Sequence, residues 1–110
     1  MKAALCIGGE MPGPGMIRRV AEEMDIVAAA DSGFDALYEI GIEPDLVLGD
    51  MDSTNYRNII EKFPSEKVHT APRDKDETDT EIGLRELYER GADRVTLIGG
   101  GGGRLDHLLG

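Results

Sequence analysis

The stretch Leu46-Val47-Leu48-Gly49-Asp50-Met51-Asp52-Ser53 joins a short apolar run to a pair of aspartates. An apolar run without a polar face is typical of a strand buried on both sides in a parallel sheet. If the extended backbone continues through residue 52, Asp50 and Asp52 project together from the strand's carboxyl end, because side chains alternate along a strand. Two such carboxylates repel each other unless a cation lies between them, and Mg²⁺ prefers oxygen ligands. The stretch therefore predicts a buried strand that ends in a metal site, or alternatively a polar turn in which Ser53 or Thr54 caps the next helix.

Length and composition indicate a single folded domain with a large negative charge. The chain has 110 residues, of which 40% are hydrophobic and 31% are charged, and this balance is typical of a globular protein. The formal net charge of -10 disfavours a nucleic-acid partner, because such a partner needs basic groups to neutralise its phosphates. A phosphate-bearing substrate would need metal ions between its oxygens and the carboxylates of the protein.

The amino-terminal residues predict a first buried strand and not a targeting segment. The apolar part of residues 3–7 is too short for a signal peptide and runs into Gly8-Gly9-Glu10. No apolar stretch approaches the roughly 20 residues that cross a bilayer. Cys6 is the single cysteine, so it cannot form an internal disulfide, and its apolar neighbours favour a small core residue. We therefore expect a cytoplasmic protein without a membrane partner.

Apolar periodicity alternates between strand-like runs and helix-like segments along the whole chain. The predicted strands are 2–7, 25–30, 45–49, 67–70 and 94–98, and the predicted helices are 15–24, 34–40, 55–63 and a segment from Thr78 or Asp79 that ends at Gly91. This alternation predicts an α/β fold, a parallel sheet of about five strands with helices on both faces in a Rossmann-like three-layer sandwich. Residues 105–109 predict the start of one more helix with nothing to pack against. We therefore expect that residues 1–110 are one domain cut from a longer protein.

Polar residues and glycines follow every predicted strand at its carboxyl end. They are Gly8 and Gly9, then Asp31, Ser32 and Gly33, then Asp50 and Asp52, then the charged segment 73–79, and finally the glycine run 99–103 with Arg104, Asp106 and His107. Loops at the opposite edge have the composition of ordinary turns. Because open parallel sheets bind ligands beyond the carboxyl ends of their strands, we expect the functional site along this edge.

The glycine run 99–103 matches neither the P-loop pattern nor the dinucleotide-binding fingerprint. It is followed at once by Arg104 and by the helix predicted at 105–109. Backbone N–H groups at a helix start, together with a guanidinium, can bind phosphate oxygens. The run therefore favours a phosphate-binding loop, and the alternative is a flexible terminus.

Four motifs follow one another along the chain: Ala30-Asp31-Ser32-Gly33, Pro44-Asp45 with Gly49-Asp50-Met51-Asp52-Ser53, Lys75-Asp76-Glu77-Thr78-Asp79, and Gly102-Gly103-Arg104-Leu105-Asp106-His107. In their order and spacing the chain resembles the thiamine pyrophosphokinase family over essentially its whole length. Enzymes of this family transfer a pyrophosphoryl group from ATP to thiamine, which gives thiamine diphosphate and AMP. The resemblance implies that residues 1–110 are the catalytic α/β domain, with Mg²⁺ as cofactor and ATP as donor. It also implies a C-terminal β-sandwich domain that this chain lacks, and a homodimer for the full-length protein.

The same resemblance implies roles for individual residues. Asp50, Asp52 and Asp79 would bind Mg²⁺, and these three would act in catalysis together with Arg104 and Asp106. The implied nucleotide-binding residues are Asp31, Gly33, Lys75, Thr78, Gly102, Gly103 and Arg104. Either Asp52 or Asp106 could accept the proton of the acceptor hydroxyl.

One residue departs from the family pattern, and other functions stay open. The family usually has glycine where this chain has Ser32. The alternatives are a pterin pyrophosphokinase of related fold, a metal-dependent phosphohydrolase, and a module that binds a nucleotide or metal without catalysis. The predicted cleft offers no aromatic wall for the rings of thiamine. We therefore expect residues 1–110 alone to bind Mg-ATP without forming thiamine diphosphate at a useful rate.

Overall fold

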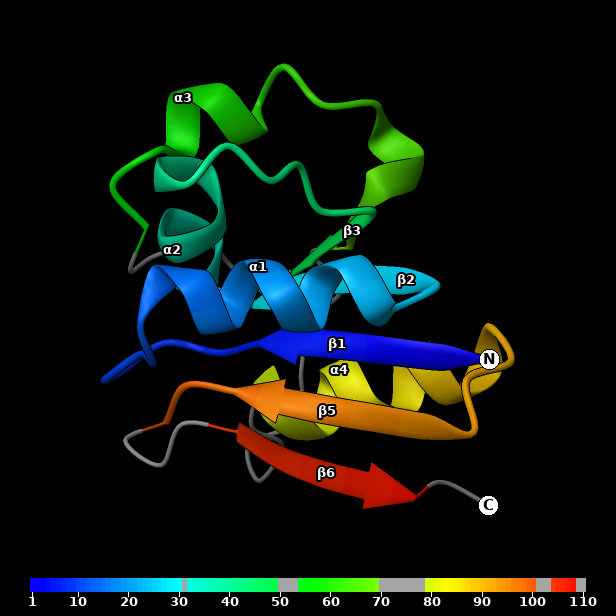
Figure 1. Cartoon of the computed structure of the whole chain (residues 1–110). Coiled ribbons are helices and arrows are strands. Elements are labelled where there is room, and N and C mark those ends of the chain that lie inside the picture. The colour runs from blue at the N-terminus through cyan, green and yellow to red at the C-terminus, as the bar shows by residue number, and fades with distance from the viewer. Residues whose placement is uncertain (31, 50–53, 70–78, 101–103, 109–110) are drawn as a thin grey trace.

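The computed structural model describes residues 1–30, 32–49, 54–69, 79–100 and 104–108 (Figure 1). Its elements are β1 (Lys2–Cys6), α1 (Pro14–Glu23), β2 (Ile26–Ala30), α2 (Gly33–Glu39), β3 (Leu46–Leu48), α3 (Arg57–Ile60), the 3₁₀ helix η1 (Ser65–Lys67), β4 (Val68–His69), α4 (Asp79–Glu89), β5 (Arg94–Ile98) and β6 (Arg104–Leu108). The six strands form one sheet in the order β4-β3-β2-β1-β5-β6. Strands β1 to β5 pair in parallel, as the alternating pattern predicts.

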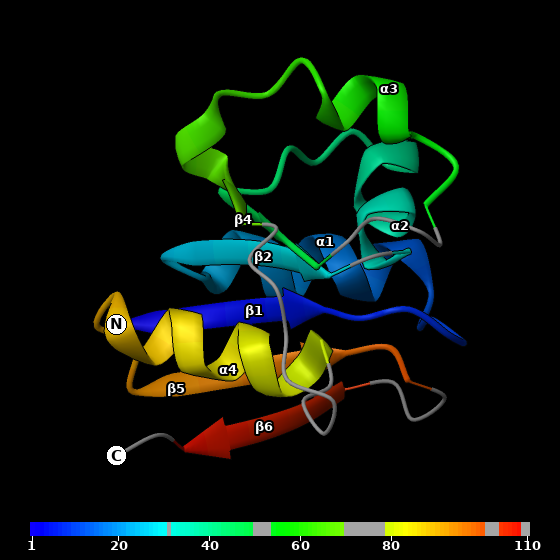
Figure 2. The same ribbon diagram turned by 180° about the vertical axis from the view of Figure 1, so that it is seen from behind.

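Helices cover both faces of this sheet, which confirms the predicted three-layer arrangement. On one face, α1, α2 and α3 pack against alternate strand residues such as Ala4 and Cys6. On the other face, α4 packs through Leu87 against the intervening residues, among them Ala3 and Leu5 (Figure 2). Because both faces of β1 are covered, its residues 3–6 are buried without interruption, and this explains the absence of a polar face in its sequence. Within the described ranges, every helix is too short or too polar to cross a membrane.

Helix α3 is shorter than the predicted segment 55–63. It holds four residues, Arg57–Ile60, and Ile60 is the buried one. Tyr56 at its start has a non-helical backbone. After Ile60 the chain continues in tighter turns, in which the Phe63 amide donates to the Ile60 carbonyl at 3.0 Å. The helix therefore ends before the predicted stop at Pro64, and Pro64 instead precedes η1.

The predicted helix at 105–109 is wrong, because Arg104–Leu108 forms strand β6. This strand runs antiparallel to β5, with Leu97 opposite Leu105 and Thr96 opposite Asp106. Val95 to Ile98 of β5 are buried, so the outer edge of β5 needs a hydrogen-bonding partner, and β6 supplies it.

Candidate active site at the carboxyl edge of the sheet

The strand order reverses between β1 and β5, which places the loops that follow these two strands side by side. From β1 the chain adds β2, β3 and β4 outward on one side, and it then returns to place β5 on the other side of β1. Such a reversal is the usual position of a ligand site in an open α/β sheet. The two loops are joined by backbone hydrogen bonds, in which the Ile7 amide donates to the Ile98 carbonyl and the Gly100 amide donates to the Gly8 carbonyl, both at 2.9 Å. The predicted location of the functional edge therefore coincides with a topological switch point.

Gly99 explains why this edge is rich in glycine. Its φ is +109°, and a Cβ at this position would lie 2.3 Å from the Ile7 carbonyl oxygen and 2.7 Å from Met11 Sδ. Any other residue would be strained and would separate the two loops. The two loops therefore meet through their backbones, with Gly8 and Gly9 against Gly100.

The start of α2 is packed directly against the end of β1. A Cβ on Gly33 would lie 2.1 Å from the Cys6 carbonyl oxygen, so the third residue of the Asp31-Ser32-Gly33 motif has a packing reason to be glycine. Ser32 lies beside Gly8, where an added Cβ would be 2.1 Å from the serine Oγ. The serine that departs from the family pattern therefore fits because its neighbour lacks a side chain.

Strand β3 is followed by Gly49 and then by the aspartate pair. Hydrogen bonds hold the chain from Thr54 onward. Asp35, in the first turn of α2, accepts a hydrogen bond from the Thr54 hydroxyl and another from the Asn55 amide, the latter at 3.0 Å. Sequence reasoning missed Asp35, because nothing local relates it to residues 19 and 20 positions away. Its single sequence signal is an acidic side chain near a helix start, which usually has only a structural meaning.

Three other predicted site residues have a described backbone. Asp79 is the first residue of α4, which precedes parallel strand β5 and so begins near the carboxyl edge (Figure 2). Arg104 pairs with Ile98, the last residue of β5, so it also lies at this edge, whereas Asp106 lies two residues further away along β6. The remaining predicted residues, Asp31, Asp50, Asp52, Lys75, Thr78, Gly102 and Gly103, lie outside the described residues. Within the described part of the chain, no three metal-ligating side chains come together.

Cys6 is the last residue of β1, next to these loops, and its thiol is unreactive. Its side chain is buried, and burial raises the pKa of the thiol to about 12. The thiolate is the nucleophilic form of cysteine, so a thiol of such high pKa is a core residue, as its sequence context predicts.

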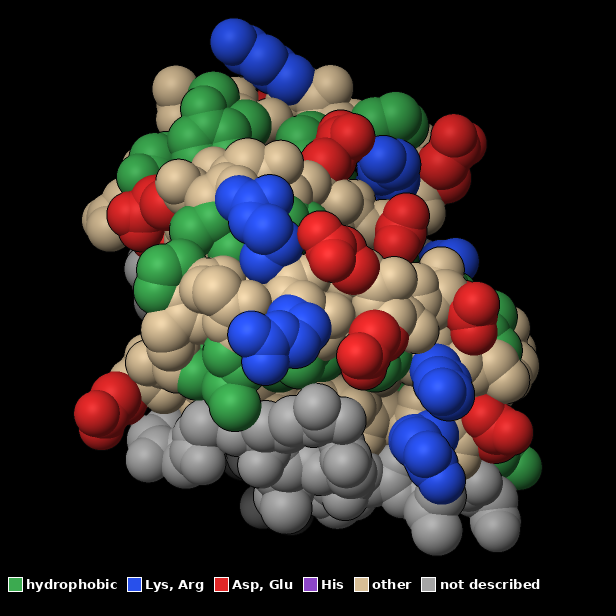
Figure 3. Space-filling view, viewed as in Figure 1, with side chains coloured by type: hydrophobic (Ala, Val, Ile, Leu, Met, Phe, Trp, Pro, Cys, Tyr) green, Lys and Arg blue, Asp and Glu red, His purple; other side chains and the backbone are tan. Residues whose placement is uncertain are grey.

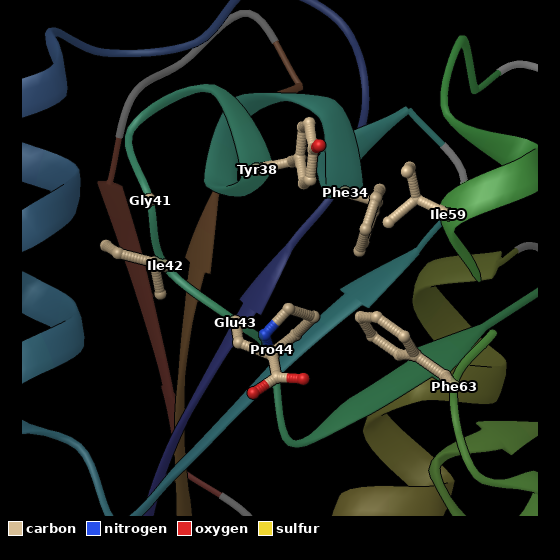
Figure 4. A pocket seen from close by; sticks show the side chains of 8 residues that line it. All are labelled: Phe34, Tyr38, Gly41, Ile42, Glu43, Pro44, Ile59 and Phe63. Carbon is tan, nitrogen blue, oxygen red and sulfur yellow. The ribbon is translucent and has the colours of Figure 1, made fainter.

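A separate apolar pocket lies on the flank formed by α2 and α3 (Figure 4). Its volume is about 250 Å³, and its walls are Phe34, Tyr38, Gly41, Ile42, Glu43, Pro44, Ile59 and Phe63. Four aromatic rings pack along this flank, with Phe34 and Phe63 5.7 Å apart and Tyr38 and Tyr56 4.5 Å apart. Residues 41–44 precede β3, so the pocket extends toward the amino ends of the strands. It is separate from the glycine-rich loops after β1 and β5.

The face that carries α1 has mixed charge. Figure 3 shows basic and acidic side chains interspersed there, with hydrophobic side chains between them. The described residues of this face form no broad basic surface for a polyanion.

The parallel sheet and the reversal of its strand order define the class of protein: an α/β protein that binds ligands beyond the carboxyl ends of its strands. The sequence model of the family described as "Thiamin pyrophosphokinase, catalytic domain" matches residues 17–110, so the chain belongs to the thiamin pyrophosphokinase family. The thiamine pyrophosphokinase of Bacillus subtilis is 34% identical over 91 residues, which cover 81% of this chain and 42% of that protein.

Solved structures agree with this assignment. The crystal structure of the Bacillus subtilis thiamine pyrophosphokinase superposes with a TM-score of 0.69 at 26% identity, covering 94% of this chain and 49% of that one. A probable thiamine pyrophosphokinase from Staphylococcus saprophyticus gives a TM-score of 0.65 at 32% identity, covering 96% and 52%. The chain therefore spans about half the length of the relatives that it matches.

Proposed function

We propose that this chain is the ATP- and Mg²⁺-binding catalytic unit of an enzyme that transfers pyrophosphate from ATP to thiamine, giving thiamine diphosphate and AMP. The observation that carries the proposal is the family match over residues 17–110. The glycine-rich loops at the strand-order reversal support it, because that is where a nucleotide binds in folds of this class. The buried, unpaired Cys6 is consistent with action in the reducing cytoplasm.

The residues of the proposed metal site fit Mg²⁺ by their chemistry. Asp50, Asp52 and Asp79 offer carboxylate oxygens, the ligands that Mg²⁺ prefers, and two of the three follow β3 directly. The start of α4 brings the backbone of Asp79 to the same edge of the sheet. When bound, the ion would neutralise charge on the ATP phosphates and on the departing AMP. This neutralisation matters because the chain itself carries a net charge of -10.

The other proposed site residues hold and orient the nucleotide. Phosphoryl-type transfer depends on positioning and charge stabilisation more than on covalent catalysis. Arg104 and the nearby glycines 102 and 103 would bind phosphate oxygens, while Asp31, Lys75 and Thr78 would line the nucleotide side of the cleft. Asp52 or Asp106 would accept the proton of the thiamine hydroxyl.

The thiamine site is proposed to need residues outside this chain. Among the described residues, the loops after β1 and β5 present mainly glycine backbone at this edge, and such a surface does not bind a cationic aromatic ring well. The relatives are about twice as long, and the full-length enzyme is proposed to act as a homodimer that completes this site. Residues 1–110 alone should therefore bind Mg-ATP yet release no AMP in a thiamine-dependent reaction.

A thermal-shift experiment tests the metal site. Mg²⁺ should raise the melting temperature of the 110-residue chain, because a ligand that binds the folded state stabilises it by mass action. Asp50→Asn should abolish most of this rise. Asp93→Asn is the control, because Asp93 lies at the amino edge, where its carboxylate accepts a hydrogen bond from the N-terminal ammonium at 3.1 Å. Equal loss of the Mg²⁺ effect in both variants would contradict the proposed site.

Calorimetry with ATP and Mg²⁺ tests the nucleotide half of the proposal. Arg104→Ala should weaken ATP binding by about 1.5–3 kcal/mol, the contribution of a charge-assisted hydrogen bond, and leave Mg²⁺ binding unchanged.

A separate experiment incubates the chain with Mg-ATP and thiamine and follows AMP and thiamine diphosphate by chromatography. Thiamine-dependent AMP release by this chain would show that the acceptor site lies within it.

A further inference from the structure

The segment that follows the aspartate pair is tied to the first turn of α2 through one carboxylate. Asp35 uses both of its oxygens, since Oδ1 accepts from the Thr54 hydroxyl and Oδ2 accepts from the Asn55 amide at 3.0 Å. The same Thr54 oxygen also accepts a hydrogen bond from the Tyr56 amide at 3.1 Å. Three consecutive residues are therefore fixed by a network that depends on Asp35 and Thr54.

Aromatic packing supports the same attachment. The ring of Tyr56 lies 4.5 Å from the ring of Tyr38 and 6.5 Å, edge to face, from the ring of Phe34. Its hydroxyl is hydrogen-bonded to Glu39 at the other end of α2. The chain from Thr54 to Tyr56 is thus held along α2 by polar contacts at its start and by ring contacts further on.

The residues 50–53 are consequently bounded by two fixed points. On the N-terminal side lies Leu48 of β3, an interior strand of the sheet, which pairs with His69 of β4 and Ala30 of β2. On the C-terminal side lies Thr54, which Asp35 holds. Fixing both ends of so short a segment reduces the conformational entropy that its aspartates lose when they bind an ion.

We propose that Asp35 is a positioning residue that raises the divalent-cation affinity of Asp50 and Asp52 by holding Thr54 and Asn55 against α2. This inference rests on the proposed function, which places the metal ligands in that segment. Asp35 acts through the chain and not as a ligand, because both of its oxygens are engaged by protein donors. We expect the loss of this attachment to weaken metal binding about tenfold, the lower end of the effects that direct hydrogen-bonding partners of metal ligands have.

Asp45 provides a matched control. Its carboxylate accepts a hydrogen bond from the Val27 amide at 2.9 Å, a contact of the same kind, but before β3 instead of after it. Asp45→Asn and Asp35→Asn therefore remove one charge each and disturb one carboxylate–amide contact each, at opposite ends of β3.

The experiment measures the dissociation constant of Mn²⁺, as a spectroscopic substitute for Mg²⁺, by titration of the 110-residue chain. Asp35→Asn and Thr54→Val should each weaken Mn²⁺ binding about tenfold, while Asp45→Asn stays within about twofold of wild type. Thr54→Val separates positioning from ligation, because it keeps the Asp35 carboxylate and removes only its hydroxyl partner. Thr54→Ser keeps the hydroxyl and should restore binding.

Two outcomes would overturn the inference. Wild-type affinity in both Asp35→Asn and Thr54→Val, with binding lost in Asp50→Asn, would reject Asp35 and leave the proposed function standing. Loss in Asp35→Asn with wild-type affinity in Thr54→Val would make Asp35 a ligand and not a positioning residue. Wild-type affinity in Asp50→Asn would instead reject the proposed metal site itself. If Asp35→Asn fails to fold, the Thr54→Val and Thr54→Ser pair decides the question.

Discussion

Three glycines in helices allow the same substitution to be compared in three environments. An alanine Cβ at Gly15 in α1 would meet nothing within 4 Å. At Gly83 in α4 it would meet the methyl groups of Leu5 at 2.7 and 3.0 Å, which are ends of a flexible side chain. At Gly33 in α2 it would meet the carbonyl oxygen of Cys6 at 2.1 Å and the carbonyl carbon at 2.5 Å, both of them backbone.

These distances predict opposite effects on stability. Gly15→Ala should raise the free energy of unfolding by about 0.5–1 kcal/mol, because alanine restricts the unfolded chain and favours the helix. Gly33→Ala has the same intrinsic benefit, but ordinary contact begins near 3.4 Å, so the start of α2 must move by about 1.3 Å from β1. Overpacking of a core commonly costs about 1–3 kcal/mol, and a rigid backbone neighbour favours the upper end. The net expectation is a loss of about 2 kcal/mol for Gly33→Ala, with Gly83→Ala near neutral because the methyl groups of Leu5 can shift.

Urea unfolding followed by far-UV circular dichroism measures the three values, since the chain has no tryptophan for fluorescence. A difference of about 3 kcal/mol between Gly15→Ala and Gly33→Ala is expected, with a melting temperature roughly 10 °C lower for the latter than for wild type. Equal stability of these two variants would refute the close approach of α2 to β1. It would also remove the packing reason for glycine in the Asp31-Ser32-Gly33 motif.

Three further predictions concern the chemistry of single groups. Because burial raises the pKa of the Cys6 thiol to about 12, alkylation by iodoacetamide at pH 8 should proceed only as fast as the chain unfolds, which mass spectrometry at increasing urea concentration can follow. Burial, and next the Glu39 carboxylate, raise the pKa of Tyr56 above its ordinary value of 10.0. The free energy of unfolding should therefore fall as the pH rises above about 10, because the tyrosine ionises first in the unfolded state. This fall should be smaller in Tyr56→Phe, as urea titrations at pH 9 and about pH 11 would show. Gly8→Ala should be destabilising in the presence of Ser32 and much less so with Ser32→Gly, and a double-mutant cycle without coupling would contradict their contact.

The fold could be predicted because its strands and helices have different hydrophobic patterns. Strands β2 and β3, and β1 after Lys2, are apolar throughout because helices cover both faces of the sheet, whereas α1 and α4 show helical spacing. Strand β6 could not be recognised in the same way. Its five residues are too few to establish a period, and their conformation is determined by the open edge of β5, a tertiary feature absent from the local sequence. Asp35 was missed for the same reason, since its hydrogen-bond partners lie 19 and 20 residues further along the chain.

The strand-order reversal lies at the edge where the sequence predicts the site, but part of the chemistry inferred from the glycine run must change. The run was expected to bind phosphate at the start of a helix, yet the chain continues into strand β6, so no helix dipole is available there. Gly99 and Gly100 have a structural reason to be glycine, because they pack against the loop after β1 whether or not a ligand is bound. The proposed phosphate-binding role then depends on the positive charge of Arg104, whose backbone pairs with Ile98, the last residue of β5, and not on a helix start.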